Sequence, residues 1–226
     1  MEKRFPSLAL FVLAMTFVAH PASAIVIGQV DDFENGTLMN WAGAPGALIN
    51  IITGGPAGVN DNFMQLTADG SGQGGRLTTF NLNQWLGNYI AQGVTTLEID
   101  LRNQGNVALS IRFAFKTENV QTTPGYLTAP MILPVGGGWQ HFSISITAAN
   151  LIAVGGPAPY TTFFAGGFED FRIIHEVGTS NLNGDFVVGQ LGIDNIRAVP
   201  EPTVTALVFG SLLVFAFLRF RSTAAR

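Results

Sequence analysis

The sequence predicts an all-β body folded as an antiparallel β-sandwich, and three observations support this. Apolar and polar residues alternate along several short segments, which is the period of a strand with one buried face. The chain holds 27 glycines in 226 residues, and many fall between those segments, where turns need them. No long segment of the body has the period of a helix. Together these patterns are typical of two packed antiparallel sheets.

The two clearest strands are 97–102 and 109–116, where nearly every second residue is apolar. Between them, 103–106 has the Asn-Gln-Gly-Asn composition of a short hairpin loop. Further strands are expected at 142–146, at 171–173 and from 186–188 through 193–196, with weaker candidates at 25–30, 47–52, 63–66, 76–80 and 126–133. This makes about nine or ten short strands. Glycine and asparagine limit the segments 85–90 and 147–151 to a helical turn or two each.

Residues 1–24 have the features of a secretory signal peptide. Lys3 and Arg4 precede an apolar stretch, and the small residues Ala22-Ser23-Ala24 form a site that a signal peptidase accepts. We therefore expect cleavage after Ala24, so that the mature chain begins at Ile25.

The C-terminal segment 199–226 combines Pro200-Glu201-Pro202, an uncharged run of sixteen residues and the basic residues Arg219 and Arg221. As a helix the run is roughly 24 Å long, slightly short of a hydrocarbon core of ~30 Å, and the arginines can snorkel and keep the C-terminus cytoplasmic. This order resembles the PEP-CTERM sorting signal of Gram-negative bacteria. The resemblance implies an inner-membrane exosortase that cuts at Pro-Glu-Pro, so that the membrane helix is only transient. The alternative is an ordinary single-span anchor.

The remaining segment, 25–198, has the length of one domain with a sizeable core. Five of the eleven basic and two of the fifteen acidic residues lie in the terminal segments, so the body holds six basic against thirteen acidic residues, a formal net charge of −7. That balance disfavours nucleic-acid binding and suits divalent cations. The chain has no cysteine, which excludes disulfides, thiol catalysis, iron–sulfur clusters and thiolate zinc sites.

Three short motifs connect the body with a known fold. Residues 31–36 (Asp-Asp-Phe-Glu-Asn-Gly), 138–142 (Gly-Trp-Gln-His-Phe) and 192–196 (Gly-Ile-Asp-Asn-Ile) are similar to segments of the galactose-binding-like jelly rolls found among carbohydrate-binding modules. The resemblance implies a jelly roll whose first and last strands lie close together and share a structural calcium ion.

By this correspondence Glu34 and Asp194 are the expected carboxylate ligands of calcium. Asp61 or Asn62, and a carbonyl around Asp32, are plausible additions. Calcium takes six to eight oxygen ligands and tolerates ligands from separate loops. The alternative is that these residues are turn residues and solvated acids, the usual fate of short acidic runs.

The resemblance also implies carbohydrate binding, which needs exposed aromatic faces beside polar side chains. Trp85 and Tyr89 lie near Gln84, Asn88 and Gln92 in sequence, so they are the predicted sugar-binding aromatics. Trp139, directly before an alternating strand, is expected to pack in the core or at its rim. The alternative for Trp85 and Tyr89 is also core packing, because phenylalanine dominates the aromatic residues with eighteen against three each of tryptophan and tyrosine.

No residue pattern predicts catalysis. His141 and His175 lie outside any protease or triad motif, and Glu169 and Asp170 would point to opposite faces of a strand, which is unsuitable for a glycosidase. The sequence therefore predicts an exported, non-enzymatic protein of the cell surface or extracellular matrix, associated with exopolysaccharide or a biofilm matrix. A secreted polysaccharide-acting enzyme with an unrecognised site and a purely structural surface protein remain the alternatives.

Overall fold

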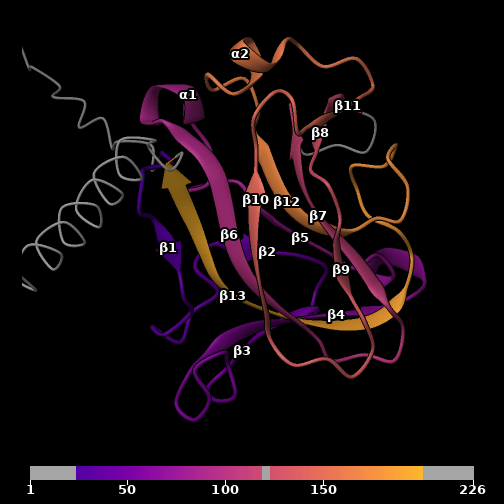
Figure 1. Ribbon diagram of the computed structural model, residues 1–226. Helices are drawn as coiled ribbons and strands as arrows, with labels where there is room; N and C mark the ends of the chain where they lie inside the picture. Colours follow the sequence, from indigo (N-terminus) through magenta and orange to yellow (C-terminus); the bar gives the residue numbers. More distant parts are fainter. Residues whose placement is uncertain (1–23, 119–122, 201–226) are drawn as a thin grey trace, which may run out of the picture.

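Two antiparallel sheets, packed face to face, form the body of the chain (Figure 1). The computed structural model describes residues 24–118 and 123–200. The expected antiparallel sandwich is confirmed. Residues 1–23 of the predicted signal peptide, which include Ala22, and residues 201–226 of the sorting segment, which include Glu201, Pro202, Arg219 and Arg221, lie outside the described residues.

The first sheet, sheet A, contains the first and last strands of the body. Its strands run in the order β10 (Gln140–Ser145), β6 (Val94–Asn103), β13 (Val188–Pro200), β4 (Phe63–Asp69) and β3 (Leu48–Ile51), with β1 (Val30–Asp31) also paired to β13. The expected closeness of the first and last strands is thus confirmed, since Val30 pairs with Arg197 and Asp31 with Ile196.

The second sheet, sheet B, has the order β11 (Ile152–Val154), β8 (Gly125–Leu127), β7 (Leu109–Lys116), β12 (Asp170–His175), β5 (Thr78–Asn81) and β2 (Trp41–Ala42), with β9 (Met131–Leu133) also paired to β7. Among residues 24–118 and 123–200, helical structure is limited to α1 (Tyr89–Gln92), α2 (Tyr160–Phe163) and a 3-10 turn at Gly72–Gly74. In the part of the chain that is described, no helix is long and apolar enough to span a membrane.

Several element boundaries differ from the sequence-based expectation. The helical turn expected within 85–90 begins only at Tyr89, and 147–151 forms a turn instead of a helix. Strand 25–30 is reduced to Val30–Asp31. At the other end β13 continues to Pro200, which pairs with Val94, so the last strand extends past the boundary expected at residue 198.

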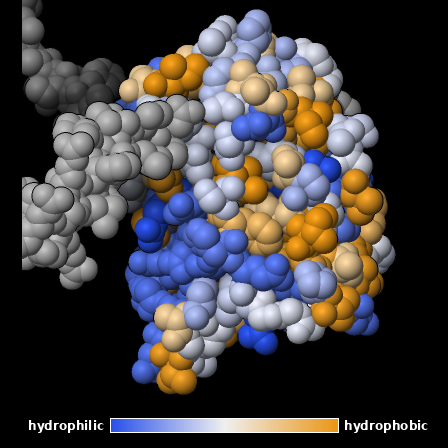
Figure 2. All heavy atoms as spheres, viewed as in Figure 1, coloured by the Kyte–Doolittle hydropathy of each residue, from blue (hydrophilic) through white to orange (hydrophobic). Residues whose placement is uncertain are grey.

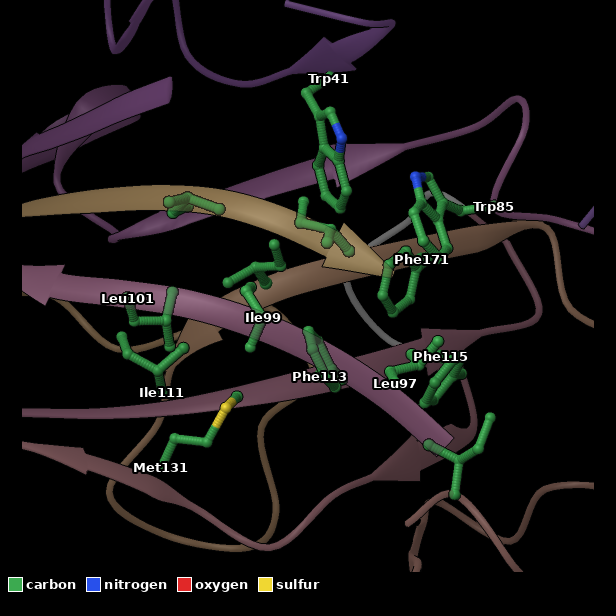
Figure 3. Close-up of a cluster of buried hydrophobic side chains, with 14 of the residues drawn as sticks. Trp41, Trp85, Leu97, Ile99, Leu101, Ile111, Phe113, Phe115, Met131 and Phe171 are labelled. Carbon is green, nitrogen blue, oxygen red and sulfur yellow. The ribbon is translucent and has the colours of Figure 1, made fainter. Parts of the chain in front are cut away.

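The core lies between the sheets and consists of the apolar half of each alternating strand. Leu97, Ile99 and Leu101 of β6 are fully buried and face β7 and β12 across the sandwich (Figure 3). Phe171 is central to the aromatic packing, with ring centroids 5.4 Å from Phe113 and 5.1 Å from Phe115. The phenylalanine-rich composition is therefore used for packing, where each aromatic ring removes a large apolar area from water.

Candidate functional site

Strand register brings ionisable side chains of three strands together on the outer face of sheet A. Asp194 of β13 pairs with Asp100 of β6, which in turn pairs with His141 of β10. The His141 Nδ1 lies 2.8 Å from Asp100 Oδ1. Because residues in register point to the same face of a sheet, these three side chains form one row across sheet A.

A bulge in β13 adds a polar side chain to this row. The pairing of β13 with β6 shifts after Asp194, and Asn195 takes a left-handed conformation with φ of 49°. Such a bulge redirects a side chain that would otherwise point to the opposite face. The Asn195 Nδ2 donates hydrogen bonds to Asp100 Oδ2 at 2.9 Å and to Asp194 Oδ2 at 3.3 Å, so it holds the two carboxylates side by side.

Two loops bring further carboxylates to the same place. Glu34, which follows β1, accepts a hydrogen bond through Oε1 from the Asn62 backbone N–H at 2.7 Å. Asp61, next to Asn62, accepts one from the backbone N–H of Ala57. Glu34, Asp61, Asp100 and Asp194 together are called the acid cluster below.

The electrostatics of the acid cluster are unfavourable for four ionised carboxylates. Asp194 is almost completely buried. Burial first, and then the charges of Asp61, Asp100 and Glu34, raise the pKa of Asp194 to about 8, despite the hydrogen bond from the backbone N–H of Asn195. The fold therefore confines negative charge here that a proton or a cation can neutralise.

Three of the four predicted calcium ligands, Glu34, Asp61 and Asp194, belong to this cluster. Asp32 makes a local turn instead, in which its Oδ1 accepts the Glu34 backbone N–H at 3.2 Å. Sequence reasoning missed Asp100, although the alternation of 97–102 already placed it on the solvent face. Among the described residues, no three His, Asp or Glu side chains have the spacing of a metal centre. The calcium site therefore stays a prediction, and it would need amide and carbonyl oxygens beside the carboxylates.

Trp139 occupies the neighbouring part of the outer face of sheet A. Its Nε1 donates to the Gly54 carbonyl at 2.9 Å, and its ring packs edge-on against Phe63 with centroids 5.2 Å apart. A Cβ on Gly192 would lie only 2.8 Å from Trp139 Cη2, so the indole rests against β13 because residue 192 is glycine. The half-buried ring thus crosses the face from the start of β10 to β4.

Polar side chains surround this indole. Gln65 of β4 pairs with Gly192 and donates through Nε2 to Gln104 Oε1 at 3.1 Å. Arg102 pairs with Gly192 from the other side, and its Nε is buried without a hydrogen-bond partner among the residues that the structure describes. Figure 2 shows hydrophilic residues gathered on the side of the body where Figure 1 places β1, β3 and β13. We refer to Trp139, Gly192, Gln65 and Gln104 as the Trp139 face.

The predicted sugar-binding aromatics Trp85 and Tyr89 are not available to a ligand, and this prediction is wrong. Both side chains are fully buried. The Trp85 Nε1 donates to Asp31 Oδ2 at 2.6 Å, and the Tyr89 hydroxyl donates to the Trp85 carbonyl at 2.9 Å. Their rings pack against phenylalanines, for example Trp85 against Phe171 at 5.7 Å. Core packing, the alternative, is the arrangement found.

Two of the residues considered for catalysis, His175 and Asp170, make structural contacts. His175 is buried, and its Nδ1 accepts the Ser110 backbone N–H at 3.0 Å; burial lowers its pKa. Glu169 is exposed, whereas Asp170 is fully buried and pairs with Arg172 at 2.7 Å. The two acids thus have opposite environments, as expected for adjacent residues at the start of a strand.

Comparisons with known proteins give similarity in structure only. The chain matches no protein-family model and no curated protein. It is similar to an exo-β-agarase, with a TM-score of 0.54 and 13% identity over 78% of this chain and 25% of that chain. It is also similar to a family 11 carbohydrate-binding module from Clostridium thermocellum in complex with a β-1,3-1,4-mixed-linked tetrasaccharide, with a TM-score of 0.47 and 17% identity over 77% and 97% of the two chains.

A tandem of two family 22 modules from Paenibacillus barcinonensis gives a TM-score of 0.46 and 14% identity over 84% of this chain and 52% of that chain. The chain spans about a quarter of the length of the agarase chain that it matches. At this identity the likeness to the agarase shows a shared fold, an all-β sandwich, and nothing about the ligand.

Proposed function

We propose that this protein is an exported, non-enzymatic protein that binds polysaccharide through the Trp139 face. The observation that carries the proposal is the half-buried indole of Trp139, held across sheet A by Gly54, Phe63 and Gly192. An aromatic ring fixed on a rigid sheet gives the C–H face of a sugar ring an apolar surface, at little cost in conformational entropy.

The neighbouring glutamines supply the polar part of such a site. Gln65 Nε2 donates a hydrogen bond to Gln104 Oε1. Among the described residues, no side-chain hydrogen bond involves the other two amide atoms, so Gln65 Oε1 can accept from a ligand and Gln104 Nε2 can donate to it. Sugar hydroxyls both donate and accept hydrogen bonds, so a paired amide of this kind suits them. The site thus combines one apolar ring with a few oriented polar groups, the usual composition of small-ligand sites.

Binding without catalysis is favoured by the state of the nearby acids. A glycosidase needs two carboxyl groups on either side of an accessible bond, about 5 to 9.5 Å apart. Asp194 is almost completely buried, and Asp100 is engaged by His141 and Asn195. A polysaccharide-acting enzyme remains the second candidate, and release of reducing ends by the purified protein would favour it.

Calcium is the cation that we propose for the acid cluster. The supporting observation is that Asp61, Asp100 and Glu34 lie close enough to the buried Asp194 carboxyl to disfavour its charged form. Together with burial, their charges raise the pKa of Asp194. Glu34, Asp61 and Asp194 come from separate segments, as calcium ligands do in many proteins, but they lack the spacing of a metal centre in the described structure, so binding of the ion would have to draw them together. Calcium at a hundredfold its dissociation constant should stabilise the fold by ~2.7 kcal/mol; a thermal unfolding curve that calcium leaves unchanged would rule the site out.

Export and sorting complete the proposal. Both ends of the described body lie side by side, since the Gly28 N–H donates to the Ala198 carbonyl at 2.9 Å and the Ala198 N–H to the Gln29 carbonyl at 3.0 Å. A signal peptidase cut after Ala24 and an exosortase cut at Pro-Glu-Pro would release the body to the surface or matrix of a Gram-negative cell. Intact-mass analysis of the secreted protein tests this: a chain that keeps Arg226 would contradict exosortase processing.

The polysaccharide proposal is tested by affinity electrophoresis of the protein in gels that contain agarose, xylan, mixed-linked glucan or no polysaccharide. Retardation by at least one polysaccharide, without release of soluble oligosaccharides, is the expected result. Equal mobility in all gels and in a wider glycan panel would contradict the proposal and favour a purely structural surface protein.

A further inference from the structure

A cleft of about 510 Å³ opens beside the loop that connects β1 to β2, away from the residues of the Trp139 face. Its volume lies within the range of small-molecule sites. Five of its seven lining residues are polar and two are apolar: Asp31, Asn35, Thr37, Asn40 and Gln84, with Leu38 and Met39. We call this the amide cleft, because side-chain amides dominate its polar surface.

The loop that forms the cleft has a strained backbone. Phe33, Met39 and Asn40 have φ values of 58°, 47° and 62°. The other left-handed residues that are not glycine, among those described, are Asn60 and Asn195. Bulky residues such as Phe and Met adopt this conformation only where the surroundings enforce it, and such strain concentrates at functional sites.

Side-chain hydrogen bonds, three of them partly buried and one exposed, hold the conformation of this loop. Gln84 Nε2 donates to the Met39 carbonyl at 2.6 Å and to Asp31 Oδ2 at 3.0 Å. Asn50 Nδ2 donates to the Phe33 carbonyl at 2.8 Å and to the Thr37 carbonyl at 2.9 Å. The loop therefore holds its shape before a ligand arrives, which lowers the entropic cost of binding.

The floor of the cleft is the buried carboxyl group of Asp31. Its Oδ2 accepts hydrogen bonds from the indole Nε1 of Trp41 at 2.7 Å and of Trp85 at 2.6 Å. Burial raises the pKa of Asp31. The cleft lining contains no lysine, arginine or histidine, so nothing in it compensates the charge of an anionic ligand.

The free polar atoms of the lining fit an uncharged ligand with several hydroxyl groups. Asn35 Oδ1 accepts from the Thr37 backbone N–H and hydroxyl, both at 2.8 Å, which leaves the Asn35 NH₂ group as a donor. Asn40 Nδ2 donates to Gln84 Oε1 at 3.0 Å, which leaves Asn40 Oδ1 as an acceptor. The Met39 side chain adds apolar surface next to these groups.

We propose that the amide cleft is a second ligand site, which binds one neutral sugar residue independently of the Trp139 face. Only the class of ligand, a sugar, rests on the proposed function. Binding in the amide cleft requires neither Trp139 nor the acid cluster. A protein with both sites would contact a polysaccharide at two places, which raises its apparent affinity by raising the local concentration of the second sugar.

The three tryptophans of the chain allow both sites to be observed in one experiment. The Nε1–H groups of Trp41 and Trp85 contact Asp31 at the floor of the amide cleft, whereas that of Trp139 contacts Gly54 on sheet A. The full chain, labelled with ¹⁵N-tryptophan and assigned with single Trp-to-Phe variants, is titrated with glucose, galactose, xylose and their neutral oligomers, and with glucuronate.

The expected result is a saturable shift of the Trp41 and Trp85 signals with at least one neutral sugar and a weaker response to glucuronate. Asn40→Gly, which keeps the positive φ but removes the amide, should weaken that binding about tenfold. The matched control is Asn60→Gly, because Asn60 has a φ of 63° but lies in another loop, outside the cleft; its titration should equal that of the unchanged protein.

The outcomes separate the two sites. Shifts confined to Trp139 would overturn the amide cleft and leave the proposed function intact. The amide cleft would also be overturned if all three signals shift and Asn40→Gly leaves those shifts unchanged. Glucuronate that binds as well as the neutral sugars would overturn it too. No shift of any signal across the panel would contradict both the amide cleft and the polysaccharide proposal.

Discussion

The two outer faces of the sandwich use charge in opposite ways. On sheet A, carboxylates gather in the acid cluster, and the half-buried Trp139 lies next to it. On sheet B, the outer face is covered by the chain itself, through the segment 176–186. Four of the six basic residues of the body, Arg76, Arg112, Lys116 and Arg172, donate hydrogen bonds to this segment.

The cover of sheet B also has an apolar centre. Leu182 packs with Ala114, Leu127 and Ile174 in a cluster separate from the main core. Asn183 Oδ1 accepts from both Lys116 Nζ at 2.8 Å and Arg172 Nη1 at 3.0 Å. The faces therefore differ in how charge is compensated: hydrogen bonds and packing stabilise the chain on sheet B, whereas on sheet A the carboxylates gather at the place where we propose a cation.

The largest expected effect is loss of stability from Asp170→Ala on sheet B. Asp170 is fully buried and pairs with Arg172, whose side chain is 8% exposed. Removing one partner of a buried pair leaves an uncompensated charge, so the free energy of unfolding should fall by about 3 kcal/mol. Urea unfolding measures this.

The control is Asp100→Ala on sheet A. The partner of Asp100, His141, has a side chain that is 56% exposed. The negative charge of Asp100 also repels that of Asp194. The change in stability should therefore stay within about 1 kcal/mol. Equal losses for the two variants would mean that the faces do not differ as described.

Leu182→Ala should have the next largest effect. The side chain is 4% exposed, and its truncation removes buried methyl groups and leaves a partly collapsible cavity, which should cost about 2 to 3 kcal/mol. Ile52→Ala is the matched control, because Ile52 is 74% exposed and should change stability by less than about 0.5 kcal/mol. If both leave the urea midpoint unchanged, the segment 176–186 does not pack on sheet B.

A pH dependence of stability is also expected, and it comes from sheet A. The pKa of Asp194 is about 8 in the folded protein and near 3.8 in a model compound, so the folded state holds a proton that the unfolded state has lost. Stability from this group is complete below pH ~4 and falls as the pH rises toward ~8. Thermal unfolding without calcium should therefore show a decreasing Tm over this range.

Asp194→Asn is the control for this pH effect, because it keeps the shape and removes the titrating proton. Its Tm should change less between pH 5 and pH 8 than that of the unchanged protein. Saturating calcium should also flatten the slope, since a bound cation favours the ionised carboxylate. An Asp194→Asn variant with the original slope would assign the pH effect to another group.

Local patterns in the sequence predict the sheets well but predict the site only in part. The alternation in 97–102 and 109–116 depends on neighbouring residues alone, and both segments are strands. The convergence of Glu34 and Asp194 was expected from the resemblance of their motifs to a known fold. Asp100 joined them through strand register, which a single strand pattern does not reveal.

The tryptophans show why the remainder could not be predicted. Trp85 has polar neighbours in sequence, yet its indole N–H reaches a buried partner, Asp31, 54 residues away. The position of Trp139 depends on Gly54 and on the missing side chain of Gly192. Whether an aromatic ring is buried or presented is thus decided by contacts between segments far apart in the chain.

The most direct test of the polysaccharide proposal compares Trp139→Ala with Phe186→Ala by affinity electrophoresis on whichever polysaccharide retards the unchanged protein. Phe186 is 52% exposed and lies beside sheet B under Arg76, so it is a control for loss of an exposed aromatic ring. Trp139→Ala should weaken binding about tenfold, the loss of roughly 1.4 kcal/mol, while Phe186→Ala binds normally. Unchanged binding of a folded Trp139→Ala protein, or an equal loss in Phe186→Ala, would contradict a ligand site on sheet A.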